Sequence, residues 1–152
     1  MYTPSQAYEF SLLFLAIWRE ARGETDDGKT AVAWVIRNRA LRLNERWYGT
    51  DWISVILKPY QFSSFNANDP NASKFPTPSD PSFGPCMLVA KRVYEGLTPD
   101  PTFGSTYYHV ASMAEYPPWA KDMQFTVHIG NHRFYRQPKP AAAAASSNVE
   151  ST

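Results

Sequence analysis

Residues 18–24 read Trp-Arg-Glu-Ala-Arg-Gly-Glu, and they close a strongly helical stretch. Apolar residues recur every three or four positions over residues 7–21, which is the period of one buried helix face. Thr3 opens the string Thr-Pro-Ser-Gln, an N-terminal capping signature, and Gly23 offers the left-handed conformation that ends many helices. The pattern predicts a helix from about residue 4 to about residue 22, with Glu20 near its C-terminal end.

Downstream of this helix, polar caps and prolines divide the chain. A second helix is predicted from Asp26 or Asp27 to about residue 43, and Asp51 is expected to cap a short third helix that ends near residue 57. Five prolines exclude a regular helix or a central strand over residues 66–85. We therefore predict a long, packed loop there.

The last third of the chain has a different composition. Pro85 is expected to open a fourth helix that ends before Gly96. Residues 106–110 and 124–129 are rich in Thr, Tyr, Val and Phe and are predicted to be short strands. The sequence thus predicts an α+β fold, mainly helical with a small antiparallel sheet. Residues 1–136 are expected to form one domain, and residues 137–152 a disordered tail rich in Pro, Ala and Ser.

Length and charge exclude several functional classes. The chain has 152 residues and a mass of 17.3 kDa, which suits a single domain. A net charge of +1 argues against nucleic acid as a partner, and the single Cys86 cannot form an internal disulfide. The apolar run of residues 12–18 is too short to span a bilayer and has no Lys or Arg before it, so we expect neither membrane insertion nor a signal peptide.

Glu20 is the acid for which we expect catalytic use. Partial burial and the negative end of the helix dipole both disfavour its charged form, so its pKa should rise, although Arg19 and Arg22 oppose the shift. A carboxyl group that keeps its proton near neutral pH can protonate a departing sugar oxygen. Position alone also allows a surface glutamate paired with a neighbouring arginine.

A larger set of residues resembles the cell wall hydrolase family of the spore-cortex-lytic enzyme (SleB) type. The matching strings are Trp-Arg-Glu-Ala-Arg-Gly-Glu at 18–24, Val-Ala-Trp-Val-Ile-Arg-Asn-Arg at 32–39, Gln-Phe-Ser at 61–63, Tyr-Tyr-His at 107–109, Trp119, and Ile-Gly-Asn-His-Arg-Phe-Tyr at 129–135. Together they cover most of residues 12–136, and the first and last strings are specific as a pair. The resemblance implies that the α+β fold is lysozyme-like and that residues 1–136 form a peptidoglycan-cleaving catalytic domain.

The resemblance also implies which bond is cut and which residues take part. The partner would be the glycan strand of peptidoglycan, cleaved between N-acetylmuramic acid and N-acetylglucosamine, with the family's catalytic glutamate at Glu20. Polar and aromatic residues are expected to bind the strand, because aromatic faces suit sugar C–H groups. These expected substrate-binding residues are Glu24, Gln61, Phe62, Ser63, Tyr107, Tyr108, His109, Trp119, His132 and Tyr135. If residues 106–110 alternate as a strand, Tyr108 faces away from Tyr107 and His109.

Two reaction outcomes follow from the chemistry of one acid. As a lytic transglycosylase, Glu20 would protonate the leaving oxygen and then take the proton of the muramoyl 6-hydroxyl, which gives a 1,6-anhydro sugar. We favour this route because it needs no second acid. A hydrolytic muramidase, in which Glu24 or another acid orients water, is the alternative.

Two rivals belong to other classes. A zinc-dependent cell wall amidase or peptidase could use His109, His128 and His132, but Gly130 and the strand-like flanks do not suit the helical spacing of such ligands. A glycan-binding module would use the aromatic residues without cutting. The arginines at positions 37, 39, 42 and 46 are interpreted as a solvated helix face.

We expect no metal and no cofactor, and we expect a monomer. The chain would be made in the cytoplasm and act on the cell wall. A phage endolysin-like member of the family, released by membrane permeabilisation to reach the periplasm, would fit these expectations.

Overall fold

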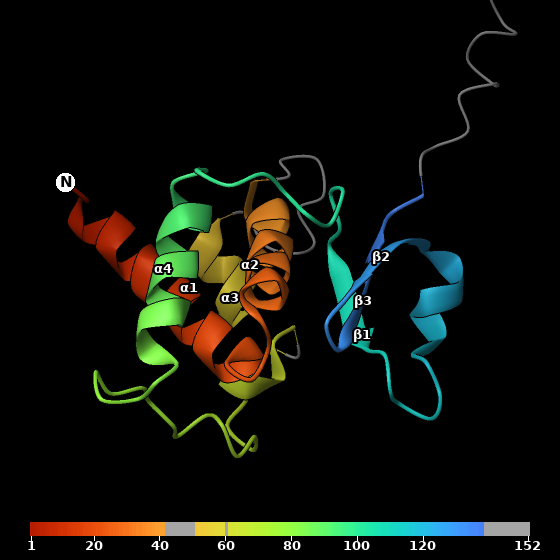
Figure 1. Cartoon of the computed structure of the whole chain (residues 1–152), viewed down its shortest axis with the longest axis horizontal. Coiled ribbons are helices and arrows are strands. Elements are labelled where there is room, and N and C mark those ends of the chain that lie inside the picture. The colour runs from red at the N-terminus through yellow and green to blue at the C-terminus, as the bar shows by residue number, and fades with distance from the viewer. Residues whose placement is uncertain (42–50, 60, 139–152) are drawn as a thin grey trace, which may run out of the picture.

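The computed structural model describes residues 1–41, 51–59 and 61–138 and divides them into a helical layer and a sheet layer (Figure 1). The four helices lie together, and the sheet stands beside α2. The helices are α1 (Pro4–Ala21), α2 (Asp26–Leu41), α3 (Trp52–Leu57) and α4 (Phe83–Tyr94); the strands are β1 (Tyr107–Val110), β2 (Gln124–Ile129) and β3 (His132–Arg136); two 3₁₀ turns are η2 (Ser63–Phe65) and η3 (Pro118–Asp122). The predicted mainly helical α+β class is confirmed.

Helix α1 begins and ends almost where the sequence predicts. The Thr3 side chain accepts a hydrogen bond from the backbone N–H of Gln6, and the Gln6 side chain accepts one from the backbone N–H of Thr3. This capping box satisfies two N–H groups that have no partner within the helix. Arg22 is the C-cap, and the turn that follows carries the chain into α2.

The helical core forms between α1 and the other three helices. Leu13 and Ile17 on α1, Ile36 on α2, Val55 on α3 and Val93 on α4 are all fully buried in it. Asp51 caps α3 through the backbone N–H of residue 54, as predicted. The end predicted for α2 near residue 43 lies outside the described residues.

Residues 66–82 contain turns and extended segments but neither helix nor strand, so the predicted long loop is confirmed. The prediction placed the start of α4 two residues too late, at Pro85; the helix begins at Phe83. Proline is tolerated in a first helical turn, where backbone N–H groups have no intrahelical acceptor. Pro85 therefore marks the first turn and not the first residue.

The sheet is antiparallel with strand order β1-β3-β2, so the last strand of the sequence lies in the middle. Phe134 on β3 is fully buried against Ala21, Val32 and Val35, and this second core cluster joins the sheet to the helices. Strands β2 and β3 are joined by a tight turn in which Gly130 has a φ of 58°. That left-handed conformation favours glycine.

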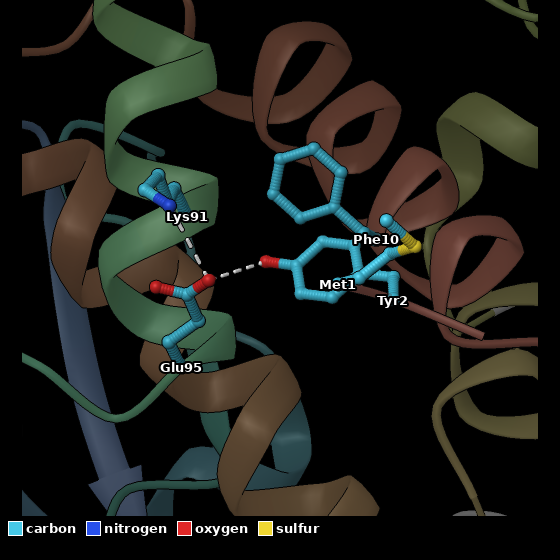
Figure 2. A pocket seen from close by; sticks show the side chains of 5 residues that line it. All are labelled: Met1, Tyr2, Phe10, Lys91 and Glu95. Atoms are coloured by element: carbon cyan, nitrogen blue, oxygen red, sulfur yellow. Dashed lines mark hydrogen bonds and ion pairs between the residues drawn. The ribbon is translucent and has the colours of Figure 1, made fainter.

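At the far end of the helical layer, the side chains of Tyr2, Phe10, Lys91 and Glu95 line a pocket with Met1 (Figure 2). Its polar groups pair with one another, because Glu95 accepts a hydrogen bond of 2.8 Å from the Tyr2 hydroxyl and contacts the Lys91 ammonium at 3.3 Å. Within the described residues, no helix has the length and apolarity needed to cross a bilayer. Residues 139–152 of the predicted tail lie outside the described residues.

Candidate active site

Glu20 lies on the last turn of α1, where that helix meets η2 and strand β1. The Ser64 hydroxyl donates a hydrogen bond of 2.8 Å to Oε1 of Glu20, and the Tyr108 hydroxyl of β1 donates another to the carboxylate. Glu20 is only partly exposed, whereas Ser64 is buried. The carboxyl group is therefore oriented by donors from two separate segments and still reaches solvent.

The pKa of Glu20 is raised above the ordinary value for glutamate. Burial is the main cause, because it disfavours the charged form, and the negative charge of Asp69 acts in the same direction. The hydrogen bonds from Ser64 and Tyr108 favour the carboxylate and oppose the rise. Glu20 is thus an acid that keeps its proton to higher pH than a free glutamate and has two donors ready for its charged form.

The serine that contacts Glu20 is Ser64, whereas the serine predicted from the sequence is Ser63. Ser63 is exposed and Ser64 is buried, because the 3₁₀ turn at 63–65 directs successive side chains to different sides. The sequence has serine at both positions 63 and 64, so Ser64 could have been considered as a site residue too.

Arg19 holds the proline-rich loop against α1. Its guanidinium donates to the backbone carbonyls of Ser64, Ala72 and Lys74 at 3.3, 2.9 and 3.2 Å. The same group lies 4.8 and 5.0 Å from the ring centres of Phe65 and Phe75. Arg19 is thus committed to the loop, and it places the segment that carries Ser64 beside Glu20.

Arg22 also bonds to acceptors other than Glu20. Its guanidinium donates to the carbonyls of Trp18 and Arg19 and to the Asn71 side chain. Arg19 still interacts electrostatically with Glu20, as expected, but the pKa of Glu20 is raised all the same because burial outweighs that attraction.

Gln61 and Phe62 are positioned by Arg39 of α2. The Arg39 guanidinium donates to Oε1 of Gln61 at 3.0 Å and lies over the Phe62 ring at 5.2 Å, and its Nε bonds to the carbonyl of Thr106. Phe62 is buried in the helical core. Interpreting the α2 arginines as a solvated face is wrong for Arg39, which is buried, and for Arg37, which bonds to the last carbonyls of α4. Positions 42 and 46 lie outside the described residues.

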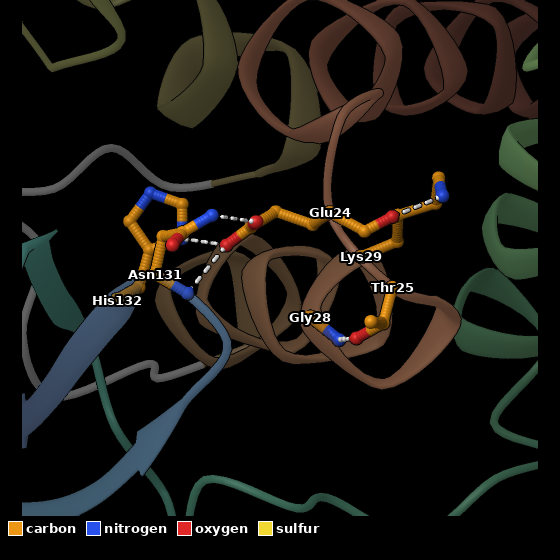
Figure 3. Close-up of polar contacts among 6 residues, drawn as sticks. All are labelled: Glu24, Thr25, Gly28, Lys29, Asn131 and His132. Carbon is orange, nitrogen blue, oxygen red and sulfur yellow. Dashed lines mark hydrogen bonds and ion pairs between the residues drawn. The ribbon is translucent and has the colours of Figure 1, made fainter.

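Glu24 connects the helical layer to the turn between β2 and β3 (Figure 3). Its carboxylate accepts hydrogen bonds from the Asn131 backbone N–H at 3.0 Å and from the Asn131 side-chain amide at 2.7 Å. Nδ1 of His132 lies 2.8 Å from Oε1, although not at the angle of a linear hydrogen bond. A Cβ at Gly130 would come within 3.1 Å of that same oxygen, so the turn fits closely over Glu24.

His132 continues this contact toward Glu20. The His132 ring meets the Tyr108 ring edge-on, with 5.0 Å between the ring centres, and Tyr108 bonds to Glu20. Burial lowers the pKa of His132 more than the neighbouring Glu24 raises it, so the neutral imidazole is favoured. The predicted site residues Glu20, Glu24, Tyr108 and His132 are therefore brought into one continuous group.

Four other predicted site residues form a second group on the opposite face of the sheet. Tyr107, His109 and Tyr135 face away from Tyr108, as the alternation of β1 predicts. Trp119 of η3 packs against all three, with ring centres 5.0 to 5.7 Å apart. Nε2 of His109 shares a hydrogen bond of 2.9 Å with the Tyr135 hydroxyl. Tyr107 also packs against the helical core, with the Arg39 guanidinium 5.3 Å from its ring centre, so this group is tied to the helices as well.

The histidines do not converge as a zinc site would require. His109 and His132 lie on opposite faces of the sheet, and His128 is exposed. Over residues 1–41, 51–59 and 61–138, no group of three His, Cys, Asp or Glu side chains could hold a metal ion. Cys86 is buried, and that burial raises the pKa of its thiol, which disfavours the thiolate needed of a nucleophile.

Comparisons with known proteins agree with this fold. A family model described as Cell Wall Hydrolase matches residues 23–135. The catalytic domain of the germination-specific lytic transglycosylase SleB from Bacillus anthracis is similar in structure, with a TM-score of 0.67 and 23% identity over 89% of this chain and 97% of that one. The catalytic domain of the Bacillus cereus SleB protein gives a TM-score of 0.69 and 24% identity over 90% and 93%. No curated protein sequence matches the chain.

Proposed function

This chain belongs to the cell wall hydrolase family, and from that premise we propose that it cleaves the glycan strands of peptidoglycan as a lytic transglycosylase, with Glu20 as its acid and base. The bond cut would be the one from N-acetylmuramic acid to N-acetylglucosamine. One of the similar structures is itself described as a lytic transglycosylase. The family match begins three residues after Glu20, so the assignment of Glu20 depends on the geometry around it.

One observation carries the proposal: Glu20 has a raised pKa and two hydroxyl donors. Glycosidic bond cleavage needs a protonated acid first and a carboxylate afterwards. Burial supplies the first state, and the hydrogen bonds from Ser64 and Tyr108 stabilise the second. The pKa of Tyr108 is raised well above its usual value by burial and by Glu20, so its hydroxyl keeps the proton that it donates.

The proposed reaction conserves every atom of the substrate. Glu20 gives its proton to the glycosidic oxygen, the bond from that oxygen to the anomeric carbon breaks, and N-acetylglucosamine leaves with a free 4-hydroxyl. The Glu20 carboxylate then accepts the proton of the muramoyl 6-hydroxyl while that oxygen bonds to the anomeric carbon. The product is a 1,6-anhydro ring, water is not consumed, and Glu20 is protonated again.

Glu24 has a structural role in this proposal. Both its oxygens contact the turn at residues 131–132, so a bound sugar or an activated water would have to displace those bonds. The reaction above requires no second carboxylate. This is why we favour transglycosylation over hydrolysis for this chain.

The test is mass spectrometry of the soluble products released from purified sacculi. We expect anhydro-ended muropeptides from the wild type and a loss of rate of about a hundredfold or more in Glu20→Gln, the range typical of general acid catalysis. Reducing muramic ends would identify a hydrolase. Released stem peptides, or activity that a chelator removes and zinc restores, would identify an amidase or peptidase. Undiminished digestion by a folded Glu20→Gln variant would overturn the assignment of Glu20.

We further propose that the enzyme acts as a monomer at the peptidoglycan layer. The residues that contact Glu20 lie on α1, η2 and β1 of the same chain, which supports this part of the proposal. Light scattering during gel filtration should give the mass of a single chain at the concentrations used for the activity assay. A stable dimer with activity that falls on dilution would refute this part.

A further inference from the structure

A pocket of about 400 Å³ opens on the outer face of the sheet, the face turned away from Glu20. Tyr116, Phe125 and Tyr135 provide its aromatic walls, and Met123 and two prolines contribute to its apolar lining. Tyr116 and Phe125 are 46% and 42% exposed, which is unusual for side chains of this size. The pocket belongs to β2, β3 and the segment around η3, and none of the groups that bond to Glu20 lines it.

The pocket has positive charge and, among its lining residues, no negative charge. Arg133 and Lys121 both line it. Glu115 and Asp122 are neighbours in sequence, yet within the described residues neither pairs with the two cations. The pocket therefore favours an anionic ligand with an apolar body.

The Arg133 guanidinium is held in place with its outer edge available. It lies 4.0 Å from the ring centre of Phe125 and 5.4 Å from that of Tyr116, and its Nε donates to the Tyr135 hydroxyl at 3.2 Å. Among the described residues, its two terminal nitrogen atoms have no hydrogen-bond acceptor. A guanidinium presented in this way matches the two oxygens of a carboxylate.

The pocket in Figure 2 has the opposite character. Its lysine, glutamate and tyrosine are already paired with one another, and the other charge among its lining residues is the N-terminal ammonium of Met1, which acts on the same Glu95 carboxylate. The outer pocket differs because its lining residues include two cations and no anion.

We propose that the outer pocket binds the carboxylate end of a short peptide attached to the glycan strand. This inference rests on the proposed function, because it takes peptidoglycan as the substrate and assigns a site to its acidic peptide. The carboxylate would bond to Arg133 with Lys121 nearby, and the methyl groups of alanine residues would contact Phe125 and Met123. An apolar wall with only two cations suits a peptide better than a phosphate polymer, which repeats its charge along the chain.

The test is titration of the ¹⁵N-labelled protein, followed by nuclear magnetic resonance, with a soluble stem tetrapeptide that carries no sugar. We expect shifts at the backbone N–H groups of residues 121–125 and 133–135. The free acid should bind about tenfold more tightly than its C-terminal amide, since a charged hydrogen bond is lost in the amide. Equal binding of the two peptides, or shifts confined to other residues, would overturn the proposal.

Two variants and one control complete the experiment. Arg133→Gln should remove the preference for the free acid over the amide. Lys121→Gln changes an exposed side chain and should reduce this preference severalfold. Arg92→Gln removes an equal charge from the exposed surface of α4 and should leave binding unchanged. If a folded double variant with Lys121→Gln and Arg133→Gln still prefers the free acid over the amide, the proposed site is refuted.

Further titrations separate the possible failures. Glu20→Gln should bind the peptide as the wild type does, so peptide binding is measured independently of strand cleavage. If the wild type binds the peptide but does not cleave sacculi, the proposed function is refuted and the pocket assignment stands. If it cleaves sacculi but does not bind the peptide, only the pocket assignment is refuted. A glycerol phosphate oligomer that binds more tightly than the peptide and depends on Arg133 would assign the pocket to a phosphate polymer instead.

Discussion

Replacing Glu24 by glutamine tests whether this residue joins the two layers or takes part in the chemistry. The side chain of Glu24 is 7% exposed, and its carboxylate accepts two hydrogen bonds from Asn131. In Glu24→Gln the amide oxygen can keep the bond to the Asn131 backbone. The new NH₂ group, however, faces the Asn131 side-chain amide, and two donors cannot bond. One charged hydrogen bond is lost, which costs about 2 kcal/mol, and for a chain of this length this lowers Tm by about 4–8 °C.

The assay combines thermal unfolding followed by circular dichroism with product analysis from sacculi at a temperature well below both Tm values. Glu115→Gln is the matched control, because it makes the same chemical change at an exposed glutamate and should leave Tm unchanged. If Glu24 joins the layers, the variant loses stability but still releases anhydro-ended products. A variant with wild-type Tm that no longer cleaves would show that Glu24 acts on the substrate and would refute our reasoning.

Four other predictions concern the acid and the loop beside it. Activity should fall as the pH rises through the raised pKa of Glu20, because the reaction begins from the protonated form. Ser64→Ala removes a bond to the carboxylate and should move this fall to higher pH, whereas Asp69→Asn removes a repulsive charge and should move it to lower pH; rate–pH profiles of both variants check the signs. At pH values below the ordinary glutamate pKa of about 4.3, Glu20 is protonated in both the folded and the unfolded chain. At higher pH its ionisation is less favourable in the folded chain, which lowers the free energy of unfolding. Glu20→Gln should therefore have the higher Tm at pH 7, with a difference that disappears near pH 4. Arg19→Lys should lose the hydrogen bonds from the guanidinium to three loop carbonyls, which lowers the free energy of unfolding by about 3 kcal/mol. Limited proteolysis of this variant should then cut within residues 66–82.

The sequence predicted the helices and two of the strands well because their signals are local. The capping box of α1, the Asp51 cap of α3 and the alternation in residues 124–129 each depend on neighbours within a few positions. The same is true of the alternation that separates Tyr108 from Tyr107 and His109. The separation of the expected aromatic site residues into two groups was thus foreseeable.

The polar contacts of the site were not foreseeable, because their partners are far apart in sequence. Glu24 bonds to a residue 107 positions away, and Arg19 bonds to carbonyls between 45 and 55 positions away. A charged residue near a helix end usually faces solvent, and only the folded loop shows that Arg19 is buried. The choice between Ser63 and Ser64 depends on a single turn whose phase the sequence does not fix.

The order β1-β3-β2 has a consequence for the chain as it leaves the ribosome. Tyr108 is on β1, and β1 is hydrogen-bonded within the sheet only to β3, the final strand to be synthesised. Until residues 132–136 have emerged, Tyr108 has no neighbouring strand to hold it against Glu20. With Glu20 as the proposed acid, a nascent or truncated chain would contain this residue without the strand that places Tyr108 beside it, and activity would appear only after β3 has been synthesised.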